Sequence, residues 1–378
     1  MSVDVRPATI AEHRTSRAIG EIAREQVVDA RIRAVVPGFD APFFQAGLAG
    51  YSDGPMRVMA RRHGAPYAVT EALLDETLIN GGKGRRREDP DLLAGRLGAW
   101  RRGEVGGEGI GAWDVGDHPI GGQVIGTYPE EMAKAAAILV ELGYDVIDVN
   151  LACPVKKVRR RHRGGHHLAD PVSAAAVLKA VREAVPRGIA TTVKMRRGYD
   201  ESRVMAGHFE RIFDAAYELG YAWATVHCRT VEQKYEGLSR WEFLTELVKR
   251  YPDRVIFGSG DIWSAEDIFA MLEITGVGAV SVARGAIGNP WIFRQARALM
   301  TGGVVAGPTL EEQRRVLLDH FDLSMALWGE RAASRMMRKS GMRYAAQHGD
   351  GEAVKGEFIK CRCAADWRGV IERHYGAG

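Results

Sequence analysis

The chain has 378 residues, of which 46% are hydrophobic and 26% are charged, and its formal net charge is only +4. This composition is typical of a soluble globular protein with one large domain and an appendage, or with two ordinary domains. The small net charge excludes nucleic-acid binding through overall charge, so any such binding has to come from clustered Lys and Arg residues.

The cysteines and the apolar runs indicate the compartment. Four cysteines (Cys153, Cys228, Cys361 and Cys363) are too few and too irregularly spaced for a disulfide framework. Cys361 and Cys363 have no second pair or histidine at zinc spacing, so no metal is expected. Because there is no run of about 18 apolar residues and no signal-peptide core, we expect a cytoplasmic protein without a membrane-spanning segment.

In chain order, residues 1–38 are polar, and we expect an amphipathic helix there, packed outside the main fold as an N-terminal extension. From Phe43 onwards, short apolar runs alternate with amphipathic stretches, which predicts repeated βα units and a parallel sheet. Strands are predicted at 43–50, 66–71, 119–126, 145–150, 190–195, 223–228, 254–260 and 278–283. Such a count over roughly 250 residues predicts a (β/α)8 TIM barrel at 39–302. The alternative, a doubly wound sheet, lacks a GxGxxG after its first strand.

Two segments fall outside the βα alternation. Residues 82–118 form an Arg- and Gly-rich excursion without strong periodicity. Residues 303–378 predict a small all-helical domain, whose first helix is expected to start at a capping box formed by Thr309 and Glu312. Its apolar face is expected to contain Leu310, Leu317, Phe321, Met325 and Trp328. A following helix carries a basic stripe, which either faces RNA phosphates or is an ordinary solvated face: Arg331, Arg335, Arg338, Lys339 and Arg343.

Polar residues and glycines follow the ends of the predicted strands, where TIM barrels build their active sites. Gly260 and Gly285 follow the last two strands, and with Arg284 they favour phosphate binding. Gln123 offers an amide to the edge of a heteroaromatic ring, and Lys194 offers a positive charge where a reduced ring is negative. Each residue taken singly is more simply an exposed loop residue, but together they suit a phosphorylated flavin.

The most informative stretch is 145–171. Its predicted strand leads into Asn150 and Cys153, and a basic loop follows. The thiol indicates proton chemistry, and the loop indicates a large anionic partner; a core cysteine and a solvated charge run are the simpler alternatives. The basic residues of the loop are Lys156, Lys157, Arg159, Arg160, Arg161 and Arg163.

These motifs resemble those of the tRNA-dihydrouridine synthase family. The family's NxxCPxKKV occurs at 150–158, and its other motifs occur in order at 46–53, 70–71, 194–198, 227–230, 259–262 and 283–293. Gly47, Cys228, Ser259 and Ala283 depart from the family pattern, as does the GGHH sequence at 164–167.

The resemblance implies an FMN-dependent enzyme that reduces specific uridines in tRNA to 5,6-dihydrouridine. NADPH would reduce FMN, a hydride would pass to uracil C6, and Cys153 would supply the proton to C5. We also expect the protein to be a monomer, with the basic loop and the helical domain contacting tRNA. The resemblance implies these cofactor contacts: Gly47, Leu48, Ala49, Gln123, Lys194, His227, Ser259, Gly260, Asp261, Ala283 and Arg284. It implies these substrate contacts: Asn150, Lys156, Lys157, Arg196 and Arg229.

Two other functions remain open from the sequence. One is an FMN-dependent barrel reductase of a small unsaturated substrate, of the dihydroorotate or enoate type. The other is a paralogue that binds RNA without reducing it.

Overall fold

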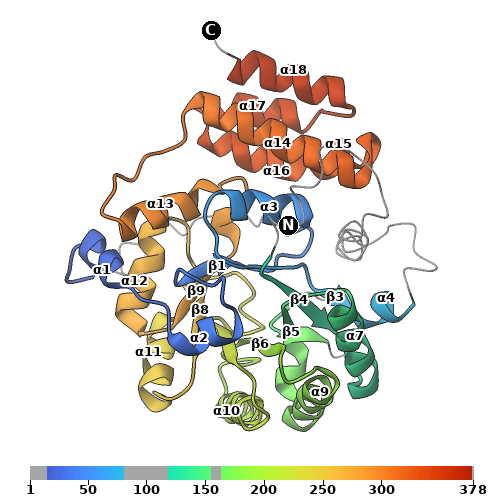
Figure 1. The fold of residues 1–378 in the computed structure, drawn as a ribbon, viewed down its shortest axis with the longest axis vertical. Coiled ribbons are helices and arrows are strands. Elements are labelled where there is room, and N and C mark those ends of the chain that lie inside the picture. The colour runs from blue at the N-terminus through green and yellow to red at the C-terminus, as the bar shows by residue number, and fades with distance from the viewer. Residues whose placement is uncertain (1–14, 81–117, 155–162, 377–378) are drawn as a thin grey trace.

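The computed structural model describes residues 15–80, 118–154 and 163–376 (Figure 1). A closed parallel barrel forms the body of the molecule. Its eight strands are β1 (Phe43–Gln45), β2 (Ala68–Val69), β4 (Ile120–Ile125), β5 (Val146–Leu151), β6 (Ala190–Arg196), β7 (Trp223–His227), β8 (Ile256–Ser259) and β9 (Ala279–Val282). Each strand pairs with its neighbours in parallel, and β1 closes the ring by pairing with both β2 and β9. The predicted TIM barrel is therefore confirmed.

Most strands end earlier than predicted at the C-terminal rim of the barrel, whereas β5 and β6 extend one residue further than predicted. The first ends at Gln45 rather than at residue 50, because a loop begins there in which Gly50 has a positive φ of 78°. The second strand is interrupted, since a short strand β3 (Leu73–Leu74) continues beside β4 after β2 has ended. Of the predicted excursion at 82–118, only His118 belongs to the described residues.

Helices surround the barrel as the alternating pattern predicts. They are α3 (Gly54–Arg62), α4 (Asp75–Ile79), α7 (Pro129–Glu141), α9 (Pro171–Ala184), α10 (Arg203–Glu218), α11 (Trp241–Arg250), α12 (Ala265–Thr275) and α13 (Trp291–Met300). Helix boundaries follow local signals: Pro129 opens α7, a capping box between Ser264 and Asp267 opens α12, and Gly276 ends α12 with a φ of 71°.

From residue 15 onwards, where the description of the N-terminal segment begins, the chain forms two short helices, α1 (Ile19–Glu25) and α2 (Ala30–Val35), instead of one long helix. Helix α1 packs outside the barrel against α12 and α13. After α2, Phe39 is fully buried at the N-terminal ends of the strands, where its ring meets Tyr67, Trp223 and Phe257 at centroid distances of 5.4–6.4 Å. These aromatic rings close the barrel floor.

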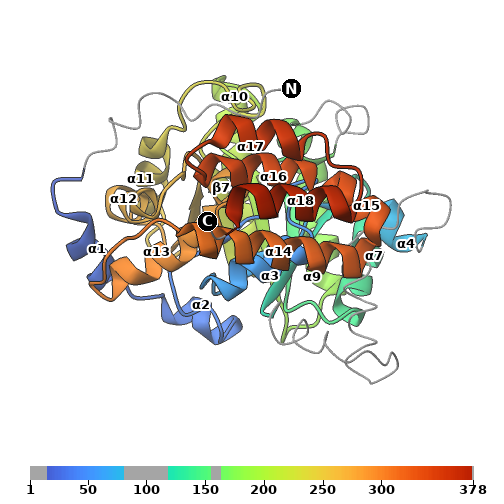
Figure 2. The ribbon, with the colours of Figure 1, turned by 90° about the horizontal axis from the view of Figure 1, so that it is seen from above.

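The helices that follow the barrel stack above α3 and α13 (Figures 1 and 2). They are α14 (Leu310–Trp328), α15 (Glu330–Met336), α16 (Arg338–Tyr344), α17 (Gly351–Phe358) and α18 (Ala364–Tyr375). The predicted capping box of Thr309 and Glu312 is confirmed. Leu317 and Phe321 are buried in a second core, whereas Leu310 is exposed and lies outside the apolar face. The second core reaches the barrel through Met59, so the helices pack firmly on it.

No helix in the described ranges is long and apolar enough to cross a membrane.

Candidate functional site

A pocket opens at the C-terminal ends of the strands, where the barrel architecture predicts an active site. It encloses about 910 Å³ including its open mouth. All eleven residues predicted to contact a cofactor line it, and Cys153, Asn150 and Arg196 line it as well. Lys156 and Lys157 lie outside the described residues. Residues more than two hundred positions apart thus converge on one site.

Cys153 follows β5 at a turn that Asn150 stabilises. The Asn150 side-chain oxygen accepts hydrogen bonds from the backbone N–H groups of Ala152 and Cys153, both at 3.0 Å. Its amide nitrogen donates to the side-chain oxygen of Gln123 at 2.6 Å. One N–H of the Asn150 amide is left for a ligand. The turn places the Cys153 side chain in the pocket wall, half-buried.

A hydrogen bond to Asp148 fixes the side chain of Gln123. The Gln123 amide donates to one Asp148 carboxylate oxygen at 2.7 Å, and the Thr192 hydroxyl donates to the other at 2.6 Å. Burial raises the pKa of Asp148. Because both Gln123 and Asn150 are held by protein partners, the amide groups at the pocket are pre-organised for a ligand.

Lys194 and His227 supply the polar groups of the pocket floor. Desolvation, aided by the nearby Arg196 charge, lowers the pKa of Lys194 to about 8. Burial, followed by the charges of Arg196 and Lys194, lowers the pKa of His227 well below its usual value, so the imidazole is neutral at pH 7. His227 Nε2 is buried without a hydrogen-bond partner among the described residues. A desolvated ammonium and an unpaired ring nitrogen fit an anionic, heteroaromatic ligand such as a flavin.

The anionic end of such a ligand fits the rim at β8 and β9. Arg284 lies over the Trp263 ring at 4.7 Å and over the Tyr235 ring at 5.1 Å. A Cβ atom added to Gly285 would clash with the Ile262 carbonyl, and one added to Gly47 would clash with the Thr70 carbonyl. These glycines therefore allow close backbone packing at the rim.

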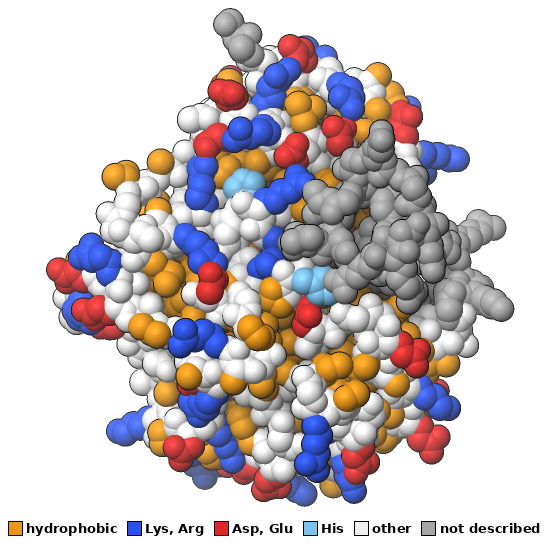
Figure 3. Space-filling view, in the orientation of Figure 1, with side chains coloured by type: hydrophobic (Ala, Val, Ile, Leu, Met, Phe, Trp, Pro, Cys, Tyr) orange, Lys and Arg blue, Asp and Glu red, His pale blue; other side chains and the backbone are white. Residues whose placement is uncertain are grey.

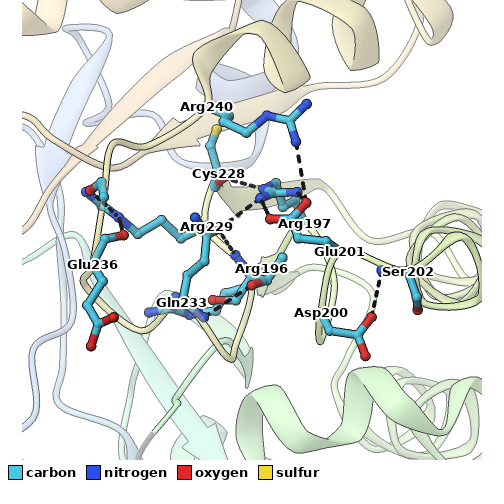
Figure 4. Close-up of polar contacts among 12 residues, drawn as sticks. Arg196, Arg197, Asp200, Glu201, Ser202, Cys228, Arg229, Gln233, Glu236 and Arg240 are labelled. Carbon is cyan, nitrogen blue, oxygen red and sulfur yellow. Dashed lines mark hydrogen bonds and ion pairs between the residues drawn. The ribbon is translucent and has the colours of Figure 1, made fainter.

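Arg196 and Arg229 shape the loop that follows β7 (Figure 4). Arg196 donates to the Ala152 carbonyl at 2.8 Å and to the carbonyls of Thr230 and Lys234 at 2.7 and 2.8 Å. Arg229 is fully buried and forms an ion pair with Asp261 at 2.7 Å. Arg229 is not among the residues that line the pocket, although the family resemblance implies that it contacts the substrate. Its position indicates that it supports the loop through Asp261.

Sequence reasoning missed two aromatic pocket residues. Tyr235 and Trp263 both line the pocket, and Tyr235 is 47% exposed. Their only sequence signal is that each is an aromatic residue in a loop after a predicted strand. Tyr235 follows Lys234, which has a positive φ of 52°, and this turn presents the ring between Arg196 and Arg284.

The described residues contain no group of three or more His, Cys, Asp or Glu side chains that could hold a metal ion.

The fold is a TIM barrel, and the residues that line its pocket fit an anionic aromatic ligand. Two solved structures share the fold, although the chain spans only about half of each. Histamine dehydrogenase from Rhizobium sp. 4-9 matches with a TM-score of 0.52 and 13% identity over 81% of this chain and 51% of that chain. An amine oxidase from Pseudomonas geniculata N1 matches with a TM-score of 0.51 and 12% identity over 81% and 53%.

The dihydrouridine synthase (Dus) family model matches residues 44–366. A probable tRNA-dihydrouridine synthase of Treponema pallidum is 32% identical over 309 residues, which are 80% of this chain and 84% of the relative. A tRNA-dihydrouridine synthase B of Shewanella oneidensis is 30% identical over 331 residues, with coverages of 87% and 94%. The chain therefore belongs to the dihydrouridine synthase family, and the resemblance found in the sequence is confirmed. Membership implies a flavin cofactor and tRNA as the substrate.

Proposed function

We propose that this protein reduces specific uridines in tRNA to 5,6-dihydrouridine in the cytoplasm, with FMN as the flavin and NADPH as the source of electrons. The observation that carries the proposal is the convergence of Cys153, Asn150 and Lys194 on one pocket. When bound, the reduced flavin supplies the hydride that is added to C6 of uracil.

The residues of the chain supply orientation and the proton. Hydride addition at C6 leaves negative charge on the uracil ring, and the Cys153 thiol donates its proton to C5 to complete the reduction. The remaining N–H of Asn150 is directed to the polar edge of the uracil. Lys194, which lines the pocket, would hold a positive charge beside the flavin ring. Arg284 and the loops of Gly260 and Gly285 would hold the flavin phosphate.

The target uridine has to leave its stack to enter a pocket at the mouth of a barrel. Tyr235, which is 47% exposed, and the buried Arg196 both line this pocket. Lys156, Lys157 and the C-terminal helices are proposed to hold the surrounding RNA backbone. Because those contacts are electrostatic, binding of tRNA is expected to weaken steeply with salt, which a barrel reductase of a small molecule would not show.

Mapping of tRNA by mass spectrometry tests the reaction and the proton donor together. In a strain that lacks the gene, one or more uridines should lose the two mass units of dihydrouridine, and the wild-type gene should restore them. Cys153→Ala should fail to restore them, whereas Cys363→Ala, which alters a cysteine far from the pocket lining, should restore them fully. Full restoration by Cys153→Ala would contradict the assignment of the acid.

A further inference from the structure

We propose that Arg163 is a positioning residue for Cys153, which it holds in place through an ion pair with Asp75 and Glu76. This inference rests on the proposed function, in which Cys153 donates the proton. It assigns to Arg163 a role different from the RNA contact that the sequence predicts for it as part of the basic loop.

Arg163 faces the interior rather than the solvent. Its side chain is only 7% exposed, and its Nη2 atom lies 2.8 Å from a Glu76 oxygen and 3.4 Å from an Asp75 oxygen. The Asp75 side chain is fully buried at the start of α4, directly after β3. The prediction that Arg163 belongs to an exposed basic patch is therefore wrong, because two carboxylates on a neighbouring part of the barrel draw the guanidinium inward.

The two residues after Arg163 pack directly on Cys153. The backbone N–H of Gly165 donates to the Cys153 carbonyl at 3.1 Å. Gly164 has a positive φ of 59°, and a Cβ atom added to it would lie 2.9 Å from the Cys153 Cβ atom. Any shift of Arg163 is thus transmitted through two residues to the backbone of the proposed acid.

Cys153 is consequently held from two sides. Asn150 fixes its backbone N–H from the β5 side, and Gly165 fixes its carbonyl from the side that Arg163 anchors. Removing one partner of a buried ion pair leaves an uncompensated charge, so the anchored segment is expected to relax toward water. A displacement of about 1 Å at a reacting group can slow a reaction about 100-fold without loss of substrate binding.

The test compares Arg163→Met with wild type, both as flavin-loaded enzymes and well below their unfolding temperatures. We expect kcat for dihydrouridine formation to fall about 10- to 100-fold, with KM for tRNA changed by less than about threefold. The rate of alkylation of Cys153 by iodoacetamide, mapped by mass spectrometry, should rise at least about threefold because the thiol is less well held. Arg163→Lys, which keeps a charge near the carboxylates, should give intermediate values.

Arg250→Met is the matched control, since it also removes an arginine from an ion pair, with Glu210, but on the exposed surface. It should match wild type in kcat and in Cys153 alkylation. If Arg163→Met does not fold, Asp75→Asn and Glu76→Gln weaken the same ion pair from the carboxylate side and should give the same pattern.

Two results would overturn the inference. One is a kcat and a Cys153 alkylation rate both within about twofold of wild type, which would leave Arg163 with a purely structural role. The other is a raised KM for tRNA with unchanged kcat, which would indicate that Arg163 contacts RNA, as expected from the sequence. Failure of the proposed function is distinguishable, because wild-type enzyme would then form no dihydrouridine, while the alkylation comparison would still report on Arg163.

Discussion

The Lys194 ammonium is desolvated at the floor of the pocket, and this has a measurable cost in the protein without flavin. Its pKa is lowered to about 8, so below that pH the folded protein holds a charge that the unfolded chain holds more easily. The resulting destabilisation is fully present below pH 8 and is relieved as pH rises from 8 toward the ordinary lysine value.

We therefore expect Lys194→Met to raise the free energy of unfolding of the flavin-free protein at pH 7, by up to about 3 kcal/mol. Urea denaturation at pH 7 and pH 9.5 measures this, and the advantage of the variant should shrink at the higher pH. A variant that is less stable than wild type at pH 7 would contradict the assignment of the charge to a desolvated position.

The lowered pKa of Lys194 also leads to a prediction of how flavin affinity depends on pH. Because the charged form of Lys194 attracts the negatively charged FMN molecule more strongly than the neutral amine does, the Kd for FMN should be flat near pH 7 and should rise above pH 8, by at most about tenfold per pH unit. Lys194→Met should bind FMN more weakly at pH 7 and should lose this pH dependence. Titration of flavin fluorescence measures both, and an identical pH profile in the variant would exclude Lys194 as the cause.

The pocket residues show how far single positions can be predicted. Gln123, Asn150 and Cys153 were predictable because they lie in or just after β4 and β5, whose apolar runs are clear. The burial of Arg229 was not, because its partner Asp261 is 32 residues away and belongs to the next loop. For Arg163 the obstacle was its neighbours in sequence, since a run of basic residues looks exposed until Asp75 and Glu76 are placed beside it.

Among the elements, the loops after β8 and β9 depend on glycines at the rim. Gly285→Ala should lower FMN affinity, because its Cβ atom would clash with the Ile262 carbonyl and push apart the two loops proposed to bind phosphate. Gly207→Ala is the control, since a Cβ atom there meets nothing within 4 Å and should stabilise α10 by about 0.5–1 kcal/mol. Calorimetric FMN binding compares the two, and equal affinities would contradict a close approach at Gly285.

Element boundaries were predictable where a cap or a proline marks them, as at Pro129, Ser264 and Thr309. They were not predictable where tertiary packing decides. The first strand stops at Gln45 although apolar residues continue, and β3 is too short to leave a pattern. The N-terminal segment divides into α1 and α2 because its apolar residues serve two sites, the outer surface at α12 and the barrel floor.

At the scale of the molecule, the basic residues that were predicted to form a stripe on one helix are divided between α15 and α16. On the face shown in Figure 3, Lys and Arg side chains lie over these helices, with Asp and Glu among them. Arg331 and Arg335 are exposed on α15. Arg338 instead donates to the Cys361 carbonyl at 2.5 Å, and Lys339 lies over the Tyr51 ring at 4.7 Å, so these two also serve packing.

Arg331→Gln and Arg335→Gln should each weaken tRNA binding and reduce the slope of log Kd against log salt by about one, if each side chain neutralises a phosphate. Lys179→Gln on α9 should leave the slope unchanged, since α9 lies at the end of the barrel away from the C-terminal helices (Figure 1). Filter binding over a salt series measures the slopes. Unchanged slopes in both arginine variants would show that these side chains face solvent and do not contact RNA.

The aromatic floor around Phe39 also restricts the order in which the two substrates can reach the flavin. Within the described ranges, Phe39 and its ring neighbours seal the lower end of the barrel, so the flavin is reached from the mouth. We therefore expect the proposed nicotinamide donor and the tRNA acceptor to occupy the same opening in turn rather than together. Initial rates measured at several fixed tRNA concentrations should accordingly give parallel double-reciprocal lines. Such lines are the signature of a ping-pong mechanism, in which the first product leaves before the second substrate binds.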